Sequence, residues 1–172
     1  MRLSNLVSES AMDRADCAVM VNTYDPLRTS LWRMSVEAPD VFTAFLSVHR
    51  AMDGGTLKRH RHFLCFVPFG SLKMRFAGLW NVEGVSDRPA EMFDRDLRFR
   101  RLHKEWNGPR ASDYCHKQKH ETRRYFDVTP SPYLDDLTGT IEIDWPDQPR
   151  TYIRSLTDYD PAIRAKETRW WP

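Results

Sequence analysis

Cysteine is scarce in this chain, with three widely spaced residues among 172. An odd, scattered set of this kind is not the framework of a secreted disulfide domain. No stretch approaches the ~20 apolar residues that a membrane helix needs, and the first residues lack the apolar run of a signal peptide. These absences predict a cytoplasmic protein that has no membrane partner.

Sequence motifs of nucleophilic catalysis and phosphate binding are also missing. The chain contains no GxSxG, GxxxxGK or GxGxxG pattern, which are the local signatures of a serine hydrolase elbow and of nucleotide-binding loops. We therefore predict no catalytic residue and no cofactor, and the sequence leans away from an enzyme. Hydrophobic residues make up 41% and aromatic residues 12%, enough for one folded domain spanning residues 1–172.

Hydrophobic periodicity and turn residues predict an α+β fold rich in strands. Helical spacing predicts one helix after Pro39, and residues 91–106 fit either a helix or an ordered basic loop. The expected strands cover residues 17–21, 62–69, 74–82, 123–128, 140–145, 150–156 and 162–167. We expect these strands to form a curved sheet or a small barrel.

Two hairpins follow from the same pattern. The strands at 62–69 and 74–82 flank a Gly-Ser turn, and those at 140–145 and 150–156 flank a Pro-rich turn. Alternation in the first hairpin predicts one face with Met74, Phe76, Trp80 and Val82 and an opposite face with Arg75 and Asn81. In the second hairpin it predicts Ile141, Ile143 and Trp145 inward and Glu142 and Asp144 outward.

Charge is distributed unevenly although the net charge is only +2. Residues 57–75 hold five Lys or Arg and no acid, residues 95–124 hold ten against four acids, and residues 125–160 reverse the balance. Basic clusters attract phosphate backbones through counterion release. The predicted nucleic-acid-binding residues are Lys58, Arg59, Arg61, Lys73, Arg75, Arg98, Arg100, Arg101, Lys104, Lys117, Lys119, Arg123 and Arg124.

Tryptophans are candidates for stacking on nucleic-acid bases. Trp80 and Trp145 lie within expected strands and are the two base-stacking candidates. Their positions on inward faces also fit core packing, and this interpretation is the more common one for strand tryptophans.

Two further sets of residues are candidates for metal ligands. The first combines His and Cys residues: His60, His62, Cys115, His116 and His120. It lacks the paired CxxC spacing of structural zinc sites. The second set is acidic: Asp135, Asp136, Glu142 and Asp144. It lacks the nearby lysine that magnesium-dependent nuclease strands carry, so we predict no metal site.

Four segments together resemble a known protein region. They are HFLCFVPF, MRFAGLWNV, GTIEIDW and PRTYIRS, and the pattern resembles the N-terminal accessory region of bacterial GIY-YIG-family nucleases. The chain contains neither GIY nor YIG, so the nuclease activity is not implied. The resemblance implies a β-rich recognition module, loosely similar to PUA-like barrels.

The charge map and the resemblance together predict a nucleic-acid-binding module of restriction or phage-defence type. DNA is the expected partner. The first alternative is a stand-alone interaction or inhibitor protein of a defence or counter-defence system, which would bind a protein partner. The second alternative is a divalent-metal nuclease that uses Asp136, Glu142 and Asp144.

Overall fold

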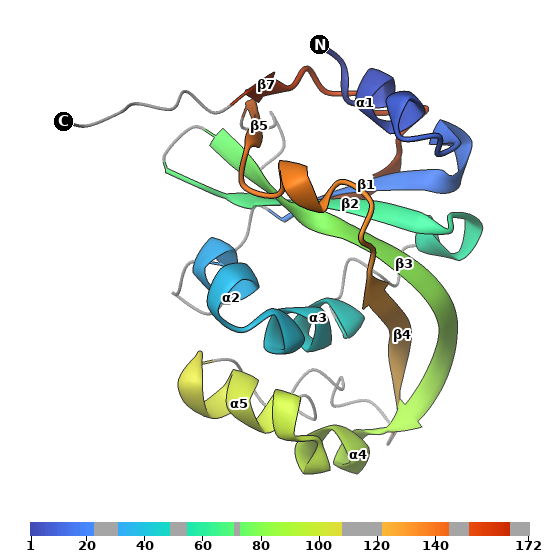
Figure 1. The fold of residues 1–172 in the computed structure, drawn as a ribbon. Coiled ribbons are helices and arrows are strands. Elements are labelled where there is room, and N and C mark those ends of the chain that lie inside the picture. Colours follow the sequence, from blue (N-terminus) through green and yellow to red (C-terminus); the bar gives the residue numbers. More distant parts are fainter. Residues whose placement is uncertain (23–30, 49–54, 71–72, 108–121, 145–151, 166–172) are drawn as a thin grey trace, which may run out of the picture.

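The chain folds around a mixed sheet whose central strands are buried on both faces (Figure 1). This computed structural model describes residues 1–22, 31–48, 55–70, 73–107, 122–144 and 152–165. Within them the strands are β1 (Cys17–Val21), β2 (His62–Pro68), β3 (Lys73–Pro89), β4 (Thr122–Pro130), β5 (Ile141–Asp144), β6 (Tyr152–Ser155) and β7 (Arg164–Ala165). The α-helices are α1 (Leu3–Glu9), α2 (Leu31–Glu37), α3 (Pro39–Ser47), α4 (Ala90–Arg95) and α5 (Leu97–Glu105). Short 3-10 turns are η1 (Arg14–Asp16), η3 (Leu57–Arg59) and η5 (Asp135–Leu137).

The described strands run in the order β6-β1-β2-β3-β5-β7, and β4 pairs with the second half of β3. Only β1 and β2 are parallel among them, and the chain between these two strands contains α2 and α3. No pairing joins β6 to β7 among the described strands, so the sheet is curved and does not close into a barrel. The α+β class and the curved sheet are therefore confirmed.

Two apolar cores lie on opposite faces of this sheet. One core contains side chains of α2, α3, α4 and α5 packed on β1, β2, β3 and β4. The other contains Leu3 and Val7 of α1, together with side chains of β1, β2, β3 and β5. Because both faces are covered, every residue of β1 is buried, as the continuous apolar run CAVMV predicts.

The expected helix after Pro39 is α3, whose apolar residues are buried against the sheet. Proline is favoured at a helix start because its fixed φ suits the first turn and its missing N–H has no partner there anyway. Residues 91–106 form helix rather than loop, divided into α4 and α5 at Asp96. Asp96 caps α5 by accepting a hydrogen bond from the backbone N–H of Arg98 at 2.8 Å.

β3 is a 17-residue strand that bends around the helices, and its two halves pair with different strands (Figure 1). Its first half pairs with β2, which confirms the predicted hairpin, and its second half pairs with β4. A bulge opposite Cys65 and Phe66 shifts the register between Phe76 and Gly78. A bulge adds one residue, so every later side chain changes face.

The single-face prediction for β3 is consequently wrong. Met74 and Phe76 lie in the core beneath α1, whereas Trp80 and Val82 belong to the core beneath the helices α2 to α5. A strictly alternating pattern does not reveal an inserted residue. The glycine at position 78 was the local sequence feature that indicated one.

The second predicted hairpin is also wrong. β5 pairs with β3 and β7, and β6 pairs with β1, so β5 and β6 are not neighbours. Sequence proximity favoured a local hairpin, but the backbone groups on the free edge of buried β1 need partners. β6 supplies those partners from Ala18 to Val21.

Candidate nucleic-acid interface

The first basic stretch, residues 57–75, does not form one surface. Lys58 and Arg59 are exposed on η3, and Arg61 is exposed next to the start of β2. Lys73 begins β3 at the other end of the hairpin, because Pro68 pairs with Met74. The two groups therefore lie at opposite ends of β2, and η3 lies away from α4 and α5 in Figure 1.

Arg75 is buried, which overturns its assignment as a phosphate ligand. Only 5% of the residue is exposed, and its guanidinium donates to Glu142 Oε1 from Nε at 3.0 Å and from Nη2 at 2.6 Å. The guanidinium also stacks on Phe69, 3.0 Å from the ring centroid, and lies 5.3 Å from the Trp32 ring.

Glu142 was predicted to point outward, and that prediction is wrong. It is 7% exposed, and besides Arg75 it pairs with Lys73 at 3.5 Å. Alternation within this four-residue strand does place the side chain of Glu142 on the other face of the sheet from Ile141 and Ile143. That face is also covered at this position, so Glu142 is not exposed. Two cations beside one carboxylate make this a structural ion pair and leave little negative charge for a metal.

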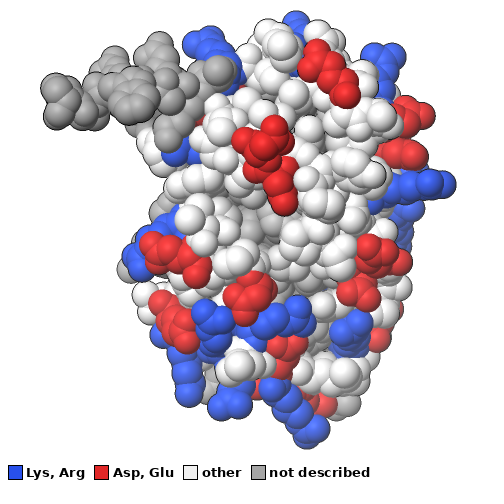
Figure 2. Space-filling view, in the orientation of Figure 1, with Lys and Arg blue, Asp and Glu red and all other residues white. Residues whose placement is uncertain are grey.

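The described cations of the second basic stretch lie on α4, α5 and β4, and we call the end of the molecule with α4 and α5 the basic end. Figure 2 shows Lys and Arg side chains over this end of the molecule, with Asp and Glu side chains between them. Several of these cations are paired. Arg98 donates to Asp96 at 2.7 Å, and Arg124 on β4 donates to Asp87 on β3 at 3.3 Å.

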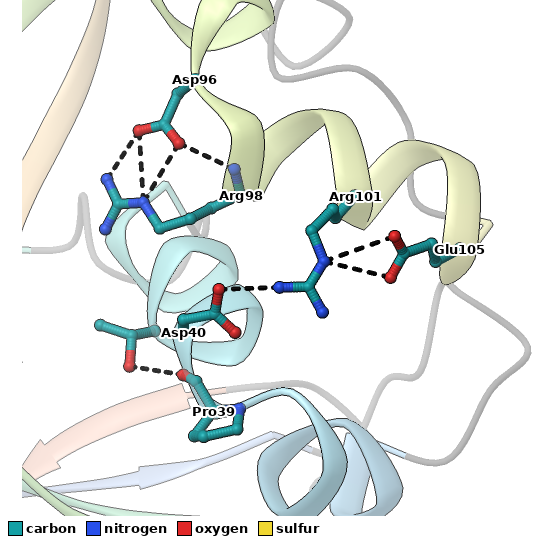
Figure 3. Close-up of polar contacts among 7 residues, drawn as sticks. Pro39, Asp40, Asp96, Arg98, Arg101 and Glu105 are labelled. Atoms are coloured by element: carbon teal, nitrogen blue, oxygen red, sulfur yellow. Dashed lines mark hydrogen bonds and ion pairs between the residues drawn. The ribbon is translucent and has the colours of Figure 1, made fainter.

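Arg101 joins α5 to α3 across the basic end (Figure 3). Its Nη1 donates to Asp40 Oδ2 at 2.9 Å, and its Nε donates to Glu105 at 3.2 Å. The same view shows Arg98 folded back on Asp96 at the start of α5. Hydrogen bonds from the Arg98 side chain hold the pKa of Asp96 below its usual value, and those same bonds raise the pKa of Arg98.

Arg123 is also wrongly assigned as a phosphate ligand. It is 9% exposed, and its guanidinium donates to the backbone carbonyl of Val48 at the end of α3. Tyr125 and Phe126 of the same strand are also buried. Arginine fits such a site because its stem packs on apolar surface while its head satisfies a carbonyl.

Three of the described cations at the basic end remain available. Arg95, Arg100 and Lys104 are exposed and form no ion pair with the described residues. Arg100 and Lys104 are one helical turn apart on α5 and therefore share a face. They border a groove of about 250 Å³ lined by Asp94, Phe99, Arg100, His103 and Lys104.

Trp80 is a core residue and offers no open face to a base. It is 5% exposed, its ring stacks on Phe63 at 5.7 Å and meets Phe42 edge-on at 5.6 Å. Its indole N–H donates to Thr43 Oγ1 at 3.3 Å. Trp145, Lys117 and Lys119 lie outside the described residues.

The described residues hold no group of three His, Cys, Asp or Glu side chains placed to bind a metal ion. His62 Nδ1 lies 2.9 Å from Asn81 Oδ1, and Asp144 pairs with Arg164 at 2.9 Å. Cys115, His116 and His120 lie outside the described part of the chain. Cys17 and Cys65 are free thiols buried in the sheet.

His60, a metal-ligand candidate from the sequence, is 9% exposed. Its Nδ1 lies 2.6 Å from the carbonyl oxygen of Thr56, and its Nε2 lies 3.0 Å from Ser155 Oγ. Ser155 is not among the residues that the sequence patterns indicated. No local pattern could have done so, because the two residues are 95 positions apart.

Comparison with protein families, curated proteins and solved structures finds no match to this chain. No helix within the described residues is both long and apolar enough to cross a membrane. The assignment of function therefore depends on the geometry of the chain itself.

Proposed function

We propose that the chain binds nucleic acid, with DNA as the expected partner, through the exposed basic face of α4 and α5. The observation that carries the proposal is the set of three exposed cations, Arg95, Arg100 and Lys104, which have no acidic partner in the described structure. Arg100 and Lys104 border the groove. Phosphates would replace solvent around these side chains and release condensed counterions. The interface is smaller than the set of basic residues that the sequence predicted.

The paired cations stabilise this face of the protein but add little attraction for phosphate. Arg98 and Arg101 are neutralised by Asp96, Asp40 and Glu105. The pair of Arg101 with Asp40 also joins α5 to α3. Phosphate contacts fix the position of a protein on nucleic acid but carry no sequence information. The proposal therefore concerns affinity for the backbone and assigns no base readout. The expected role in restriction or phage defence stays a prediction.

The test is a salt titration with two matched double variants. Fluorescence anisotropy would measure binding of labelled duplex and single-stranded oligonucleotides between low and physiological salt. Arg100→Gln/Lys104→Gln removes two phosphate contacts and should reduce the slope of log affinity against log salt by about 1.8 for duplex DNA, since each contact contributes about 0.9. Lys58→Gln/Arg59→Gln removes the same charge from η3 and should leave the slope unchanged.

Absence of binding at low salt for every oligonucleotide would overturn the proposal. An equal change of slope in both double variants would assign the binding to net charge rather than to α5. Far-UV circular dichroism of both variants would establish that the helices are intact.

A protein partner at the same end is the second candidate, favoured by two exposed apolar side chains. Met92 on α4 is 51% exposed and Leu97 at the start of α5 is 66% exposed. Apolar groups of this size add little to a phosphate contact but are common in protein interfaces. Binding that persists in high salt and is lost in Met92→Ser/Leu97→Ser would favour this candidate over nucleic acid.

A further inference from the structure

The hydrogen bonds of His60 determine which of its ring nitrogens carries a proton. A carbonyl oxygen can only accept, so the contact between Nδ1 and the Thr56 carbonyl at 2.6 Å requires the proton on Nδ1. In the neutral ring, Nε2 then has a lone pair and can only accept. The hydroxyl of Ser155, 3.0 Å away, therefore donates its proton to Nε2.

Backbone hydrogen bonds hold both residues in place. The N–H of His60 donates to the carbonyl of Leu57 at 3.2 Å, and the N–H of Arg61 donates to the carbonyl of Asp16 at 3.0 Å. After Ser155, the N–H of Leu156 donates to the Cys17 carbonyl at 2.9 Å. The side chains are thus attached to fixed backbone next to η3 and on β6, which is the pre-organisation that a reacting pair needs.

The two residues differ in exposure. His60 is 9% exposed, whereas Ser155 is partly exposed and its neighbour Thr157 is exposed. Thr157 Oγ1 lies 2.8 Å from Ser155 Oγ. The Thr157 hydroxyl also donates to Asp158 Oδ1, at the longer distance of 3.4 Å.

We infer that Ser155 and His60 form a nucleophile and general-base pair that reacts with carboxylic esters. Ser155 Oγ attacks the carbonyl carbon while its proton moves to His60 Nε2. The bond to the leaving alcohol breaks, and that oxygen takes the proton from Nε2. Water then attacks the acyl group, again losing its proton to Nε2. The bond between the acyl carbon and Ser155 Oγ breaks, Oγ takes the proton back, and the acid is released. The carbonyl of Thr56 keeps the ring in the tautomer that this cycle needs.

This pair is independent of the proposed nucleic-acid interface. His60 follows η3 and Ser155 ends β6, and neither residue belongs to α4 or α5. Failure of one proposal therefore leaves the other in place.

The test uses a fluorophosphonate probe on the full chain, followed by peptide mass spectrometry. Serine attack on phosphorus displaces fluoride, and His60 takes the proton. We expect one adduct on Ser155 in the wild type and none there in Ser155→Ala. His60→Asn keeps an amide donor for the Thr56 carbonyl but lacks the base, and should slow labelling by about 100-fold or more. Ser86→Ala, a substitution of a strand serine in β3, is the matched control and should label at the wild-type rate.

Absence of an adduct on Ser155, or an equal labelling rate in His60→Asn, would overturn the inference. If His60→Asn does not fold, labelling of the wild type with and without denaturant decides the question. Labelling that is as fast in the denatured chain would also overturn the inference, because the pair exists only in the folded sheet.

Discussion

Gly78 lies where β3 changes faces, and its backbone has φ of +136°. A Cβ at this position would lie 3.1 Å from the ring of Trp80. We expect Gly78→Ala to lower the free energy of unfolding by roughly 1–3 kcal/mol, because a side chain is strained at this φ. Urea unfolding followed by tryptophan fluorescence would measure it.

Gly84→Ala is the matched control for that substitution. Gly84 is also at a bulge of β3, and a Cβ added there would have no atom within 4 Å. A loss of stability as large as that of Gly78→Ala would show that the strain at position 78 is not the cause.

Glu142 balances the buried charge of Arg75, and its removal should be costly. Glu142→Ala leaves the guanidinium without its counter-ion, and breaking a buried pair costs roughly 3–5 kcal/mol. Asp144 lies on the same strand as Glu142, and its partner is Arg164 in an exposed ion pair. Asp144→Ala should therefore cost less than about 1 kcal/mol. Chemical denaturation of both variants would compare them, and equal losses would contradict the structural role of the Arg75–Glu142 pair.

The thiols of Cys17 and Cys65 should react only after unfolding. Burial, with smaller contributions from Asp16 and Asp13, raises the pKa of Cys17 to about 12. Burial alone raises the pKa of Cys65. The thiolate is the reactive form, so both cysteines should be unmodified by iodoacetamide at about pH 8 in the native protein and modified in denaturant. Peptide mass spectrometry would locate the modified residues, and fast native labelling of either would contradict this burial.

At the scale of elements, α5 begins at an ion pair whose strength depends on pH. The pKa of Asp96 is lower in the folded chain than in the unfolded chain because of Arg98. Its contribution to stability is therefore complete above the unfolded pKa of about 4, and it is lost as the pH falls through the folded value.

The Asp96→Asn variant isolates that contribution. Asparagine keeps the helix cap but not the charge, so it should be less stable than the wild type by about 0.5–1 kcal/mol at neutral pH. The difference should shrink below about pH 4. Thermal unfolding at about pH 7, 5 and 3 would check this, and a difference independent of pH would show that the charge of Asp96 does not contribute.

For the whole molecule, the two cores share their central strands. β1, β2 and β3 contribute side chains to both cores. Removing apolar contacts from either core should therefore destabilise the same sheet. Phe42→Leu beneath the helices and Leu3→Ala beneath α1 should each lower the urea midpoint, and Leu3→Ala should cost about 2–5 kcal/mol. Circular dichroism and tryptophan fluorescence should give coincident transitions. A separate early transition in Leu3→Ala would show that α1 and its core unfold independently.

Local patterns were sufficient to predict most elements. The apolar run of β1, the β2–β3 hairpin and the start of α3 at Pro39 each depend on neighbouring residues. Burial on one or both faces and the conformational limits of glycine and proline act within a few residues. The α+β class follows from the same information, because it needs only the kinds of element and their order.

Only the tertiary structure decided which of those elements meet and which charges are free. Arg75 and Glu142 are 67 positions apart, and an arginine in an alternating strand cannot be distinguished from a solvent-exposed one until its partner is placed. The pairing of β6 with the edge of β1 could not be predicted from local sequence either. Nor could the bulge that points Trp80 toward the core beneath the helices. The residue sequence therefore determined the elements, whose causes are local, whereas the exposed face of α5 and the contact between His60 and Ser155 arise from long-range packing.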